Sequence, residues 1–404
     1  MSNWQKVKLG EIAQIIDGDR GKNYPKNNEF FDKGFCLFLN TGNVTQDGFS
    51  FESNQFITEE KDSSLRKGKL TRGDLVYTTR GTVGNIAFYD RNVQFHNVRI
   101  NSGMVILRAN EQYVIASFLY QLLKSDATRR YIKSFCTGSA QPQLPIKNLS
   151  QILLDFPPKD VQHRIATILS RYDSLIENYQ KQIKLLEEAA QRLYKEWFVD
   201  LRFPGHENTK IVDGVPEGWK KGVLNDIAYE SGKKVDKKNR DYYNYYLPID
   251  CLPKHSLTYL TPADISLAES SLVSFEENDI IFGAMRPYFH KVCFAQSNGL
   301  TRTTCFVLNS KENEYREYLL MLLFEDSTVK HATSISIGTT MPYTRWKEFK
   351  SMEIIIPAKE IAVVFGKQIS RITNVLNKLS SQIRLLTEAR DRLLPKLMSG
   401  EIAV

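Results

Sequence analysis

The feature that most constrains this chain is an internal duplication. The stretch 170–193 shares ten identical residues with 370–393, and the offset of 200 holds there without a gap. Near the start of the chain, the pattern Trp-(x4)-Leu-(x2)-Ile-Ala begins at Trp4 and begins again at Trp219. Because self-similarity on this scale is the signature of a repeat architecture, we interpret the chain as a tandem duplication.

Each copy has the same internal order. Alternating apolar and polar runs predict strands, a shorter helical pattern interrupts them, and proline precedes a long helical pattern. We therefore predict an α+β fold in which two pseudo-two-fold-related globular domains are joined by two long antiparallel coiled-coil helices. The predicted division is a first domain at 1–158, a central helix at 159–200, a linker at 201–218, a second domain at 219–358 and a C-terminal helix at 359–404.

The two long helical patterns carry a narrow apolar stripe with the three-four spacing of a coiled coil. A helix over 169–197 rises about 43 Å and needs a partner of its own length, so the stripe of the other copy is the predicted partner. The alternative is that each helix packs only on its own globular block, which usually requires a wider stripe. The predicted seam residues are Leu169, Tyr172, Ile176, Tyr179, Ile183, Leu186, Leu193 and Trp197, with Ile369, Ile372, Leu376, Leu379, Ile383, Leu386, Leu393 and Leu397. Arg390 interrupts the second stripe, and we expect a carboxylate to hold it or the contact to end there.

Composition excludes several classes of protein. Hydrophobic residues make up 42% and charged residues 25% of the 404 positions, which is typical of globular chains and not of disordered ones. The longest apolar run, 319–324, is far shorter than the roughly 20 residues of a membrane span, and we expect no secretory signal at the start. Five scattered cysteines without CxxC spacing predict reduced thiols and a cytoplasmic location.

The sequence also lacks the motifs of several catalytic chemistries. It contains no phosphate-binding loop, no zinc-ligand spacing, no nucleophile elbow and no Asn/Asp-Pro-Pro-aromatic motif of amino-methylating enzymes. The net charge is +8, and a basic excess favours a partner that carries phosphates. We therefore predict a non-catalytic binding protein that holds no metal and no cofactor of its own.

Six segments together carry a resemblance to a known family. They are Trp4-(x4)-Leu9-(x2)-Ile12, the block Gly73-Asp74-Leu75-Val76 with Arg80-Gly81-(x2)-Gly84, Gly138-Ser-Ala-Gln-Pro142-Gln, Tyr194-Lys-Glu-Trp197-Phe-Val-Asp200, Phe203-Pro-Gly205 and Leu393-Leu-Pro-Lys-Leu397-Met-Ser-Gly400-Glu-Ile402. These segments are spread over the whole chain. Through them the chain resembles, from end to end, the specificity (S) subunit of type I restriction–modification systems.

The resemblance implies a function. Two target-recognition domains would each read one half of a split, asymmetric site in double-stranded DNA. The long helices would act as a ruler of about 43 Å, against roughly 34–36 Å for one turn of B-DNA. They would also dock two methyltransferase (M) subunits, which recruit restriction/translocase (R) subunits. S-adenosylmethionine, ATP and Mg²⁺ would then belong to those partners, and the chain itself would bind no membrane and no small-molecule substrate.

The side chains that read duplex DNA are expected in loops. Arg or Lys recognises guanine, Asn or Gln recognises adenine, and hydroxyl groups adapt to either, whereas phosphate contacts only set position. In the first copy the predicted DNA contacts are Arg20, Lys22, Tyr24 and Lys26, then Thr78, Thr79, Arg80 and Thr82, then Ser139, Gln141 and Gln143. Each residue taken singly fits an ordinary surface position equally well; their clustering in loops favours DNA.

The second copy places comparable side chains at matching positions and departs in detail, with Ile281-Phe282-Gly283-Ala284-Met285-Arg286-Pro287 in place of the Gly-x-x-Gly version. Its predicted contacts are Arg286, Tyr288, His290 and Lys291, then Thr339, Thr340, Tyr343 and Arg345, with Lys233, Lys234, Lys237, Lys238 and Arg240 holding phosphates. A solvated loop is the alternative for this lysine run. The sequence predicts no metal partner for His290, so it is treated as a hydrogen-bonding residue, and the tyrosine run 242–246 is predicted to pack as a strand.

Two other functions stay open at this point. A non-catalytic coiled-coil scaffold would bind protein partners through its helices and would form no sequence-dependent complex with DNA. An active methyltransferase or nuclease would require the missing motifs and would predict methyl transfer by the isolated chain.

Overall fold

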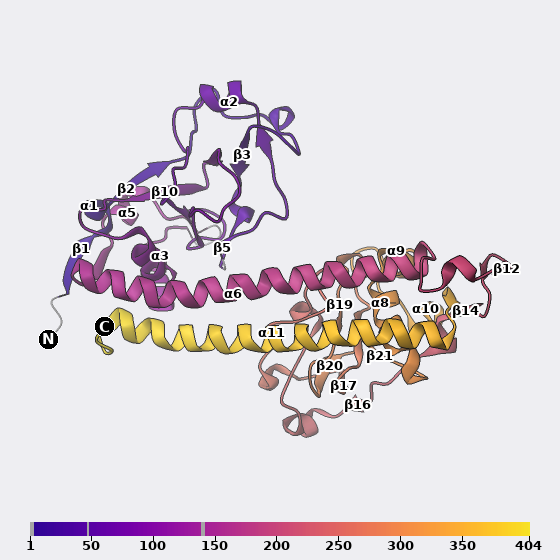
Figure 1. Cartoon of the computed structure of the whole chain (residues 1–404). Helices are drawn as coiled ribbons and strands as arrows, with labels where there is room; N and C mark the ends of the chain where they lie inside the picture. Colours follow the sequence, from indigo (N-terminus) through magenta and orange to yellow (C-terminus); the bar gives the residue numbers. More distant parts are fainter. Residues whose placement is uncertain (1–3, 47, 139–141) are drawn as a thin grey trace. The chain divides into compact units, whose positions relative to one another are not determined.

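The computed structural model describes residues 4–46, 48–138 and 142–404 of the chain (Figure 1). Its contacts form two compact units: the first unit contains the residues up to Ser174 together with Glu388–Val404, and the second unit contains Leu175–Thr387. Each long helix, α6 (Lys159–Tyr194) and α11 (Lys359–Ser399), contributes residues to both units. The compact units therefore differ from the predicted division, which assigned whole helices to separate segments.

A four-stranded antiparallel sheet forms the centre of the first unit. Its strand order is β2 (Ala13–Asp17), β10 (Met104–Ala109), β7 (Leu75–Thr78) and β8 (Ile86–Phe88). Alternate residues of β10 point to opposite faces, as a strand requires. Val105 and Leu107 pack in the cluster that includes α3 (Ala116–Lys124), whereas Met104 and Ile106 pack in a second cluster with residues of a smaller sheet.

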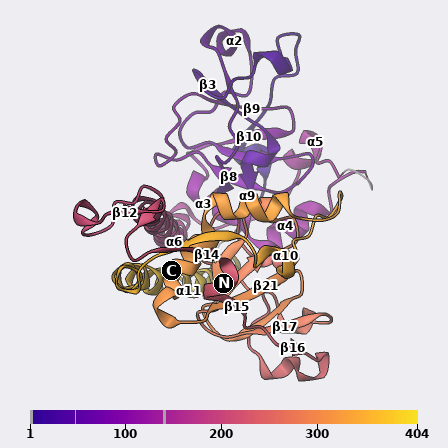
Figure 2. The ribbon, with the colours of Figure 1, turned by 90° about the vertical axis from the view of Figure 1, so that its right-hand side faces the viewer.

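That smaller sheet has the order β6 (Phe56–Ile57), β3 (Cys36–Leu39) and β9 (Val98–Ile100). Together with α2 (Glu59–Ser64), it lies at the end of the first unit away from α3 (Figures 1 and 2). Strand β1 (Gln5–Lys8) pairs with β11 (Leu153–Phe156), directly before α6 begins. The remaining elements of this unit are α1 (Leu9–Ile12), α4 (Asp126–Lys133), α5 (Ile146–Ser150), β4 (Val44–Thr45) and β5 (Gly48–Phe49).

The second unit repeats the topology of the main sheet, whereas its smaller sheet is antiparallel throughout and that of the first unit contains the parallel pair β3–β9. Its main sheet has the order β15 (Ala228–Glu230), β21 (Cys305–Ser310), β18 (Ile280–Gly283) and β19 (Val292–Phe294), and β14 (Lys220–Val223) pairs with β22 (Glu353–Ile356) before α11. A three-stranded sheet contains β16 (Lys234–Val235), β17 (Leu272–Phe275) and β20 (Gly299–Arg302). Helices α7 (Leu224–Ile227), α8 (Arg316–Phe324), α9 (Asp326–Ser334) and α10 (Trp346–Phe349) complete the unit. Equal strand order and equal position of the helices confirm the duplication.

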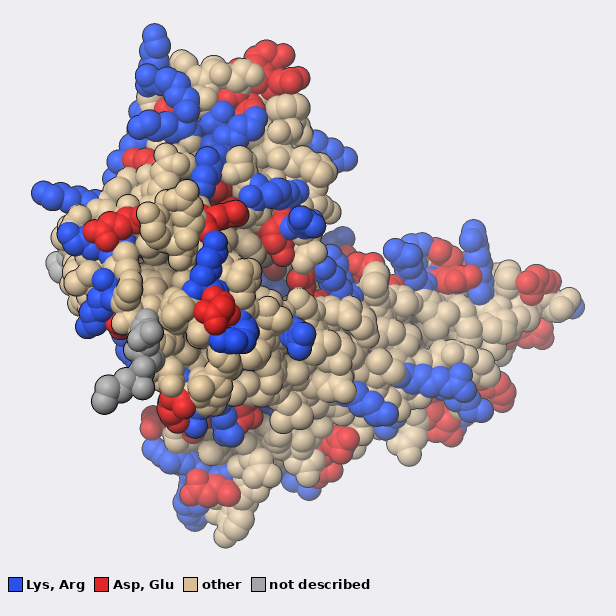
Figure 3. All heavy atoms as spheres, turned by 60° about the vertical axis from the view of Figure 1, so that its left-hand side comes forward, with Lys and Arg blue, Asp and Glu red and all other residues tan. Residues whose placement is uncertain are grey.

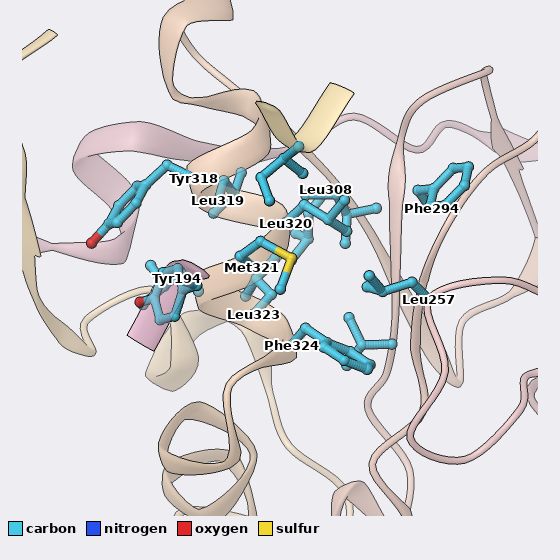
Figure 4. Close-up of a cluster of buried hydrophobic side chains, with 14 of the residues drawn as sticks. Tyr194, Leu257, Phe294, Leu308, Tyr318, Leu319, Leu320, Met321, Leu323 and Phe324 are labelled. Atoms are coloured by element: carbon cyan, nitrogen blue, oxygen red, sulfur yellow. The ribbon is translucent and has the colours of Figure 1, made fainter. Parts of the chain in front are cut away.

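Helix α8 forms the centre of the second unit's core. Residues 317–324 are all buried, which fits a helix that is apolar on every side. Figure 4 shows side chains of α8 such as Met321 and Phe324 between Tyr194 of α6 and Leu308 of β21. The C-terminal part of α6 therefore packs against the second globular block and not against the block that precedes it in sequence.

The two long helices pack against each other in each unit, and they do so antiparallel. In the second unit Trp197, near the end of α6, contacts Phe365, near the start of α11, with ring centroids 5.7 Å apart. In the first unit Leu169 shares a buried cluster with Leu394 and Leu397, near the end of α11. Figure 1 shows the paired segments side by side. The predicted coiled-coil pairing is confirmed, and the alternative that each helix packs only on its own block is wrong.

The segment 201–218, predicted as a linker, is an ordered part of the second unit. It contains the hairpin of β12 (Ile211–Val212) and β13 (Val215–Pro216), and Phe203 packs on Trp219 with ring centroids 4.8 Å apart. A π-helical turn, η3 (Lys195–Val199), ends α6 just before it.

Arg390, the polar residue in the second stripe, is held by a carboxylate. Its Nη1 lies 2.8 Å from Oδ1 of Asp173 on α6, and the side chains of the two residues are 15% and 25% exposed. Without Arg390, the cation that remains beside Asp173 is Lys124 at 3.8 Å, so the carboxylate loses its closer partner, and losing one partner of a largely buried pair costs more than the pair itself contributes.

Replacing Arg390 should therefore destabilise the first unit. We expect Arg390→Ala to lower the free energy of unfolding by about 1–3 kcal/mol, measured by urea denaturation followed by circular dichroism. Arg392→Ala is the matched control, because Arg392 on the same helix is 78% exposed and pairs with Glu388 one turn away. That control should change the stability by less than about 1 kcal/mol. Equal effects of the two substitutions would contradict a structural role for the Arg390–Asp173 pair.

Candidate nucleic-acid interface

In the first unit, two loops predicted separately from the sequence lie side by side. After β7 ends, the N–H groups of Thr79 and Arg80 both donate to the carbonyl of Gly103, at 2.9 and 3.2 Å, and the N–H of Leu144 donates to the carbonyl of Thr79 at 2.9 Å. Arg80 and Gln143 thereby form an isolated antiparallel bridge. Both residues are exposed, so a guanidinium and an amide are presented together on one surface.

The threonines of this loop have a different role from the predicted one. Thr78 and Thr79 are buried, and their hydroxyl groups donate to main-chain carbonyls, Thr78 to Thr82 and Thr79 to Gly103. The same Thr78 oxygen accepts the N–H of Asn85 at 2.9 Å. Because these hydroxyl groups are already bonded inside the protein, we assign both threonines to shaping the loop and correct their prediction as DNA contacts. Thr82 is exposed, and it remains a candidate contact.

The next predicted loop is only partly described. Ser139 and Gln141 lie outside the described residues. Gln143 exchanges two main-chain hydrogen bonds with Thr137, at 2.8 and 2.9 Å, which close the loop at its base. The side chain of Gln143 thus projects from a fixed backbone.

The basic segment 20–26 is held in place by a buried carboxylate. Asp19 accepts the N–H groups of Gly21 at 2.7 Å and Arg66 at 2.8 Å, and these hydrogen bonds lower the pKa of its carboxyl group. Lys22 and Lys26 are exposed, as predicted for phosphate contacts, while Arg20 bonds to Asp17 at 3.2 Å and stays accessible.

Tyr24, in the same segment, does not have the predicted role of a DNA contact. Its ring packs edge-on against Phe38 with centroids 5.7 Å apart, and burial raises the pKa of its hydroxyl group. The side chain therefore belongs to a small core cluster and not to a DNA-stacking surface.

Sequence reasoning missed a basic cluster beside this segment. Arg66 and Lys67 are exposed and directly follow α2, and the N–H of Arg66 is one of the two that bind Asp19. Figure 3 shows basic side chains gathered over this end of the first unit. The available signal was the spacing of Lys61, Arg66, Lys67 and Lys69 within nine positions; of these, Lys61 and Lys69 pair with Glu29 and Asp62.

In the second unit, the loop that follows β18 is held by the same set of main-chain hydrogen bonds as the loop that follows β7 in the first unit. We call this set the loop frame, and the loop after β18 the recognition loop of the second unit. The N–H groups of Ala284 and Met285 donate to the carbonyl of Thr304, at 3.0 and 3.2 Å, and the N–H of Thr344 donates to Ala284 at 2.9 Å. Met285 forms a bridge with Tyr343, as Arg80 does with Gln143. The structural counterpart of Arg80 is therefore Met285 and not Arg286.

Arg286 occupies the position that Gly81 has in the first unit. Gly81 has a φ of +71° and Arg286 has a φ of +51°, a left-handed conformation that costs a residue with a side chain about 1–2 kcal/mol. Its main-chain N–H donates to Pro342 at 2.7 Å and its Nη2 donates to the carbonyl of Thr340 at 3.1 Å. The guanidinium is thus aimed along the neighbouring loop 338–343. Backbone strain of this kind is a feature of functional sites.

The other predicted contacts of the second unit divide into two groups. Exposed and available are Tyr288, Thr339, Thr340 and Arg345. Engaged within the protein are Lys291, whose ammonium group donates to Ile249 at 2.7 Å, and Tyr343, whose hydroxyl group donates to Thr303 at 3.1 Å.

His290 also lacks its predicted role as a DNA contact. It is 2% exposed, and its Nε2 lies 2.9 Å from the carbonyl of Phe324. Burial, followed by the neighbouring His255, lowers the pKa of this imidazole. A buried ring with this partner cannot reach a base edge, so we remove His290 from the predicted DNA contacts.

The first two residues of the lysine run, Lys233 and Lys234, line an open pocket of about 990 Å³ in the second unit. Lys233 and Lys234 are exposed at its edge, together with Tyr242. Lys237 pairs with Glu269 at 3.3 Å and Lys238 with Asp236 at 3.7 Å, whereas Arg240 is anchored on the carbonyl of Ser266 at 3.0 Å.

The tyrosine run 242–246 only partly follows its predicted packing. Tyr246 is buried and forms bridges with Ala263 and Leu300, but Tyr242 is 85% exposed.

The two units share one loop frame and one pairing of long helices, and they display different loop side chains, which defines a class of duplicated two-unit proteins. Within the described ranges, no helix has the length and apolar character needed to cross a membrane. Comparison with known proteins identifies the family. A family model for the type I restriction modification DNA specificity domain matches residues 1–188 and again 216–389.

Relatives match over the whole chain. The specificity subunit of the type I restriction enzyme MjaIX from Methanocaldococcus jannaschii is 29% identical, and the alignment covers 100% of this chain and 94% of the relative. The HindI specificity subunit from Haemophilus influenzae is 25% identical, with 100% of both chains covered. A crystal structure of a type I restriction–modification S subunit from M. genitalium has the same fold, with a TM-score of 0.62 at 17% identity over 98% of this chain and 96% of that one.

The chain therefore belongs to the family of type I restriction–modification DNA specificity subunits. These are the non-catalytic, DNA-recognising members of their complexes. The resemblance found in the sequence is confirmed.

Proposed function

We propose that this chain recognises a bipartite, asymmetric site in double-stranded DNA, and that each unit reads one half. The observation that carries the proposal is the loop frame, which is built from the same main-chain hydrogen bonds in both units but displays different side chains. Arg80 and Gln143 stand where the second unit has Met285 and Tyr343. Equal backbones with unequal side chains are what two different half-sites require.

The chemistry of the exposed side chains supports this division. A guanidinium such as that of Arg80 can donate two hydrogen bonds to guanine, and an amide such as that of Gln143 can pair with adenine. Lys22, Lys26 and the lysine run beginning at Lys233 would contact phosphates, which position the protein without reading sequence.

We further propose that α6 and α11 set the spacing of the half-sites and dock two methyltransferase subunits, through which restriction/translocase subunits bind. The outer faces of the helices support docking. Leu185 and Leu385, at equivalent positions of the two copies, are 64% and 63% exposed, although large apolar side chains are usually buried. S-adenosylmethionine, ATP and Mg²⁺ would act in those partners, and the complex would work in the cytoplasm.

Arg80→Ala tests base reading. We expect the variant, assembled with its methyltransferase partners, to lose discrimination at one position of one half-site, at a cost of about 1–3 kcal/mol. Competition gel shifts with singly substituted duplexes measure this. Arg164→Ala, which removes an exposed arginine of α6 paired with Asp160, is the control and should leave discrimination unchanged.

Two results would contradict this assignment. Equal weakening on every duplex would make Arg80 a phosphate contact. A complex that shows no sequence preference even with the unsubstituted chain would favour a protein scaffold over a DNA reader.

Shortening the helices tests the spacing. Removing 177–183 and 380–386 deletes one heptad from each helix. The deleted segment begins four residues after Asp173 on α6 and ends four residues before Arg390 on α11, so the two deletions lie opposite each other in the antiparallel pair. Seven helical residues rise about 10.5 Å and one base pair about 3.4 Å, so the unread gap should shorten by about 3 base pairs. Modified-base sequencing of cells that express the variant with its partners measures the gap. Removing 177–183 alone puts the two stripes out of register and should abolish methylation, whereas an unchanged gap after the double deletion would disprove the ruler.

A further inference from the structure

Three residues that the sequence keeps far apart meet beside the recognition loop of the second unit. They are His255, His290 at the end of the turn η8 (Pro287–Phe289), and Asp326, the first residue of α9. One potential ligand atom from each lies within 4.8 Å of the other two. The two imidazole rings have centroids 4.3 Å apart, and the N–H of His255 donates to the carbonyl of His290 at 2.9 Å.

The hydrogen bonds of His290 determine what its second nitrogen can do. Nε2 faces the carbonyl of Phe324 at 2.9 Å, and because a carbonyl only accepts, Nε2 must carry the hydrogen. In a neutral ring Nδ1 is then a lone pair, and it lies 3.1 Å from Oδ1 of Asp326. Two acceptors would face each other across that gap. A doubly protonated ring would also resolve the conflict, as an ion pair with Asp326, but a metal ion would in addition engage the imidazole of His255, whose ring centroid lies 4.3 Å away.

We propose that His255, His290 and Asp326 bind a divalent transition-metal ion of the zinc class. A cation between Nδ1 and Oδ1 turns the two facing lone pairs into two bonds. Ligands of a tetrahedral zinc ion with bonds of about 2.1 Å are about 3.4 Å apart, close to the 3.1 Å that separates Nδ1 from Oδ1. Two imidazoles exclude Mg²⁺ and Ca²⁺, which prefer an all-oxygen ligand set.

The surroundings have the organisation expected around a metal. A ligating histidine usually donates its other ring N–H to a carbonyl or carboxylate, as His290 does to Phe324. His255 and Asp326 are exposed, so water can reach the site and fill the fourth position. The loop that carries His255 is anchored on α6, where the Glu187 carboxylate accepts Ser256 Oγ at 2.7 Å and the N–H of Leu257 at 2.8 Å.

Among the described residues, the first unit has no equivalent of this three-residue group. Asp126 begins α4 as Asp326 begins α9, but the first unit has Gly84 and Asn85 before β8, where the second has His290 and Lys291 before β19. Asn85 instead bonds to the carbonyl of Val44 at 2.9 Å. The metal would tie η8, which directly follows Arg286, to α9 and to the His255 loop, and so would hold the strained arginine in its position.

Metal titration of the full-length chain, without a histidine tag and after dialysis against EDTA, tests the proposal. We expect one equivalent of Zn²⁺ to bind by isothermal titration calorimetry, and Co²⁺ in its place to give the visible absorption of a tetrahedral complex. Because loss of an outer partner alone typically costs about 10–100-fold in metal affinity, His255→Gln and Asp326→Asn should each weaken binding by about 100-fold or more. His331→Gln on the same helix as Asp326 is the control and should bind as the unsubstituted chain does.

The exposed positions of His255 and Asp326 make both variants compatible with folding, and circular dichroism verifies that. Absence of zinc binding by the unsubstituted chain would overturn the proposal. So would equal binding by all four proteins. Because the titration contains no DNA and no partner subunit, its outcome is independent of the proposed reading of half-sites.

Discussion

The pairing of one narrow apolar stripe with another is the constraint on which the rest of this structure depends. A helix with the seam of a coiled coil cannot bury its apolar residues alone. In each unit the partner stripe belongs to the other copy: Leu169 packs with Leu397 in the first unit, and Trp197 with Phe365 in the second. Each compact unit is therefore complete only when helices from both copies contribute to it.

Because each long helix pairs with the long helix of the other copy, it has two kinds of surface. One face of each helix carries the coiled-coil seam and also packs on a globular block. Tyr194 of α6, for example, packs beside α8 (Figure 4). The other face keeps apolar residues such as Leu185 and Leu385 exposed. Exposed leucines at equivalent positions of the two copies support the proposed docking of two similar partners.

The loops that follow β7 and β18 show a second physical principle. The main-chain hydrogen bonds that hold each loop do not involve its exposed side chains. Main-chain hydrogen bonds to Gly103 and to Thr304 hold the two loops in the same way, so the backbone is independent of the exposed side chains. Under the proposed reading of DNA, specificity would change by substitution at Arg80 or Met285 without rebuilding the fold, since sites on a rigid support tolerate variation. Arg286 is the exception, because it replaces a glycine at a left-handed position and brings strain with it.

The sequence by itself determined the duplication, the two long helices, their seam and the loops where recognition residues gather. These features rest on periodicity and on repeated short patterns, which are local properties of the chain. Only the tertiary structure decided which loop residues face outward. Thr79, Tyr24 and His290 have side chains that suit DNA contact, yet Gly103, Phe38 and Phe324 engage them within the protein. No local pattern encodes a carbonyl or a ring that is supplied from distant positions. The meeting of His255, His290 and Asp326 was decided in the same way, because the packing of η8 against α9 and the hydrogen bond from His255 to His290, and not their spacing in the chain, bring them together.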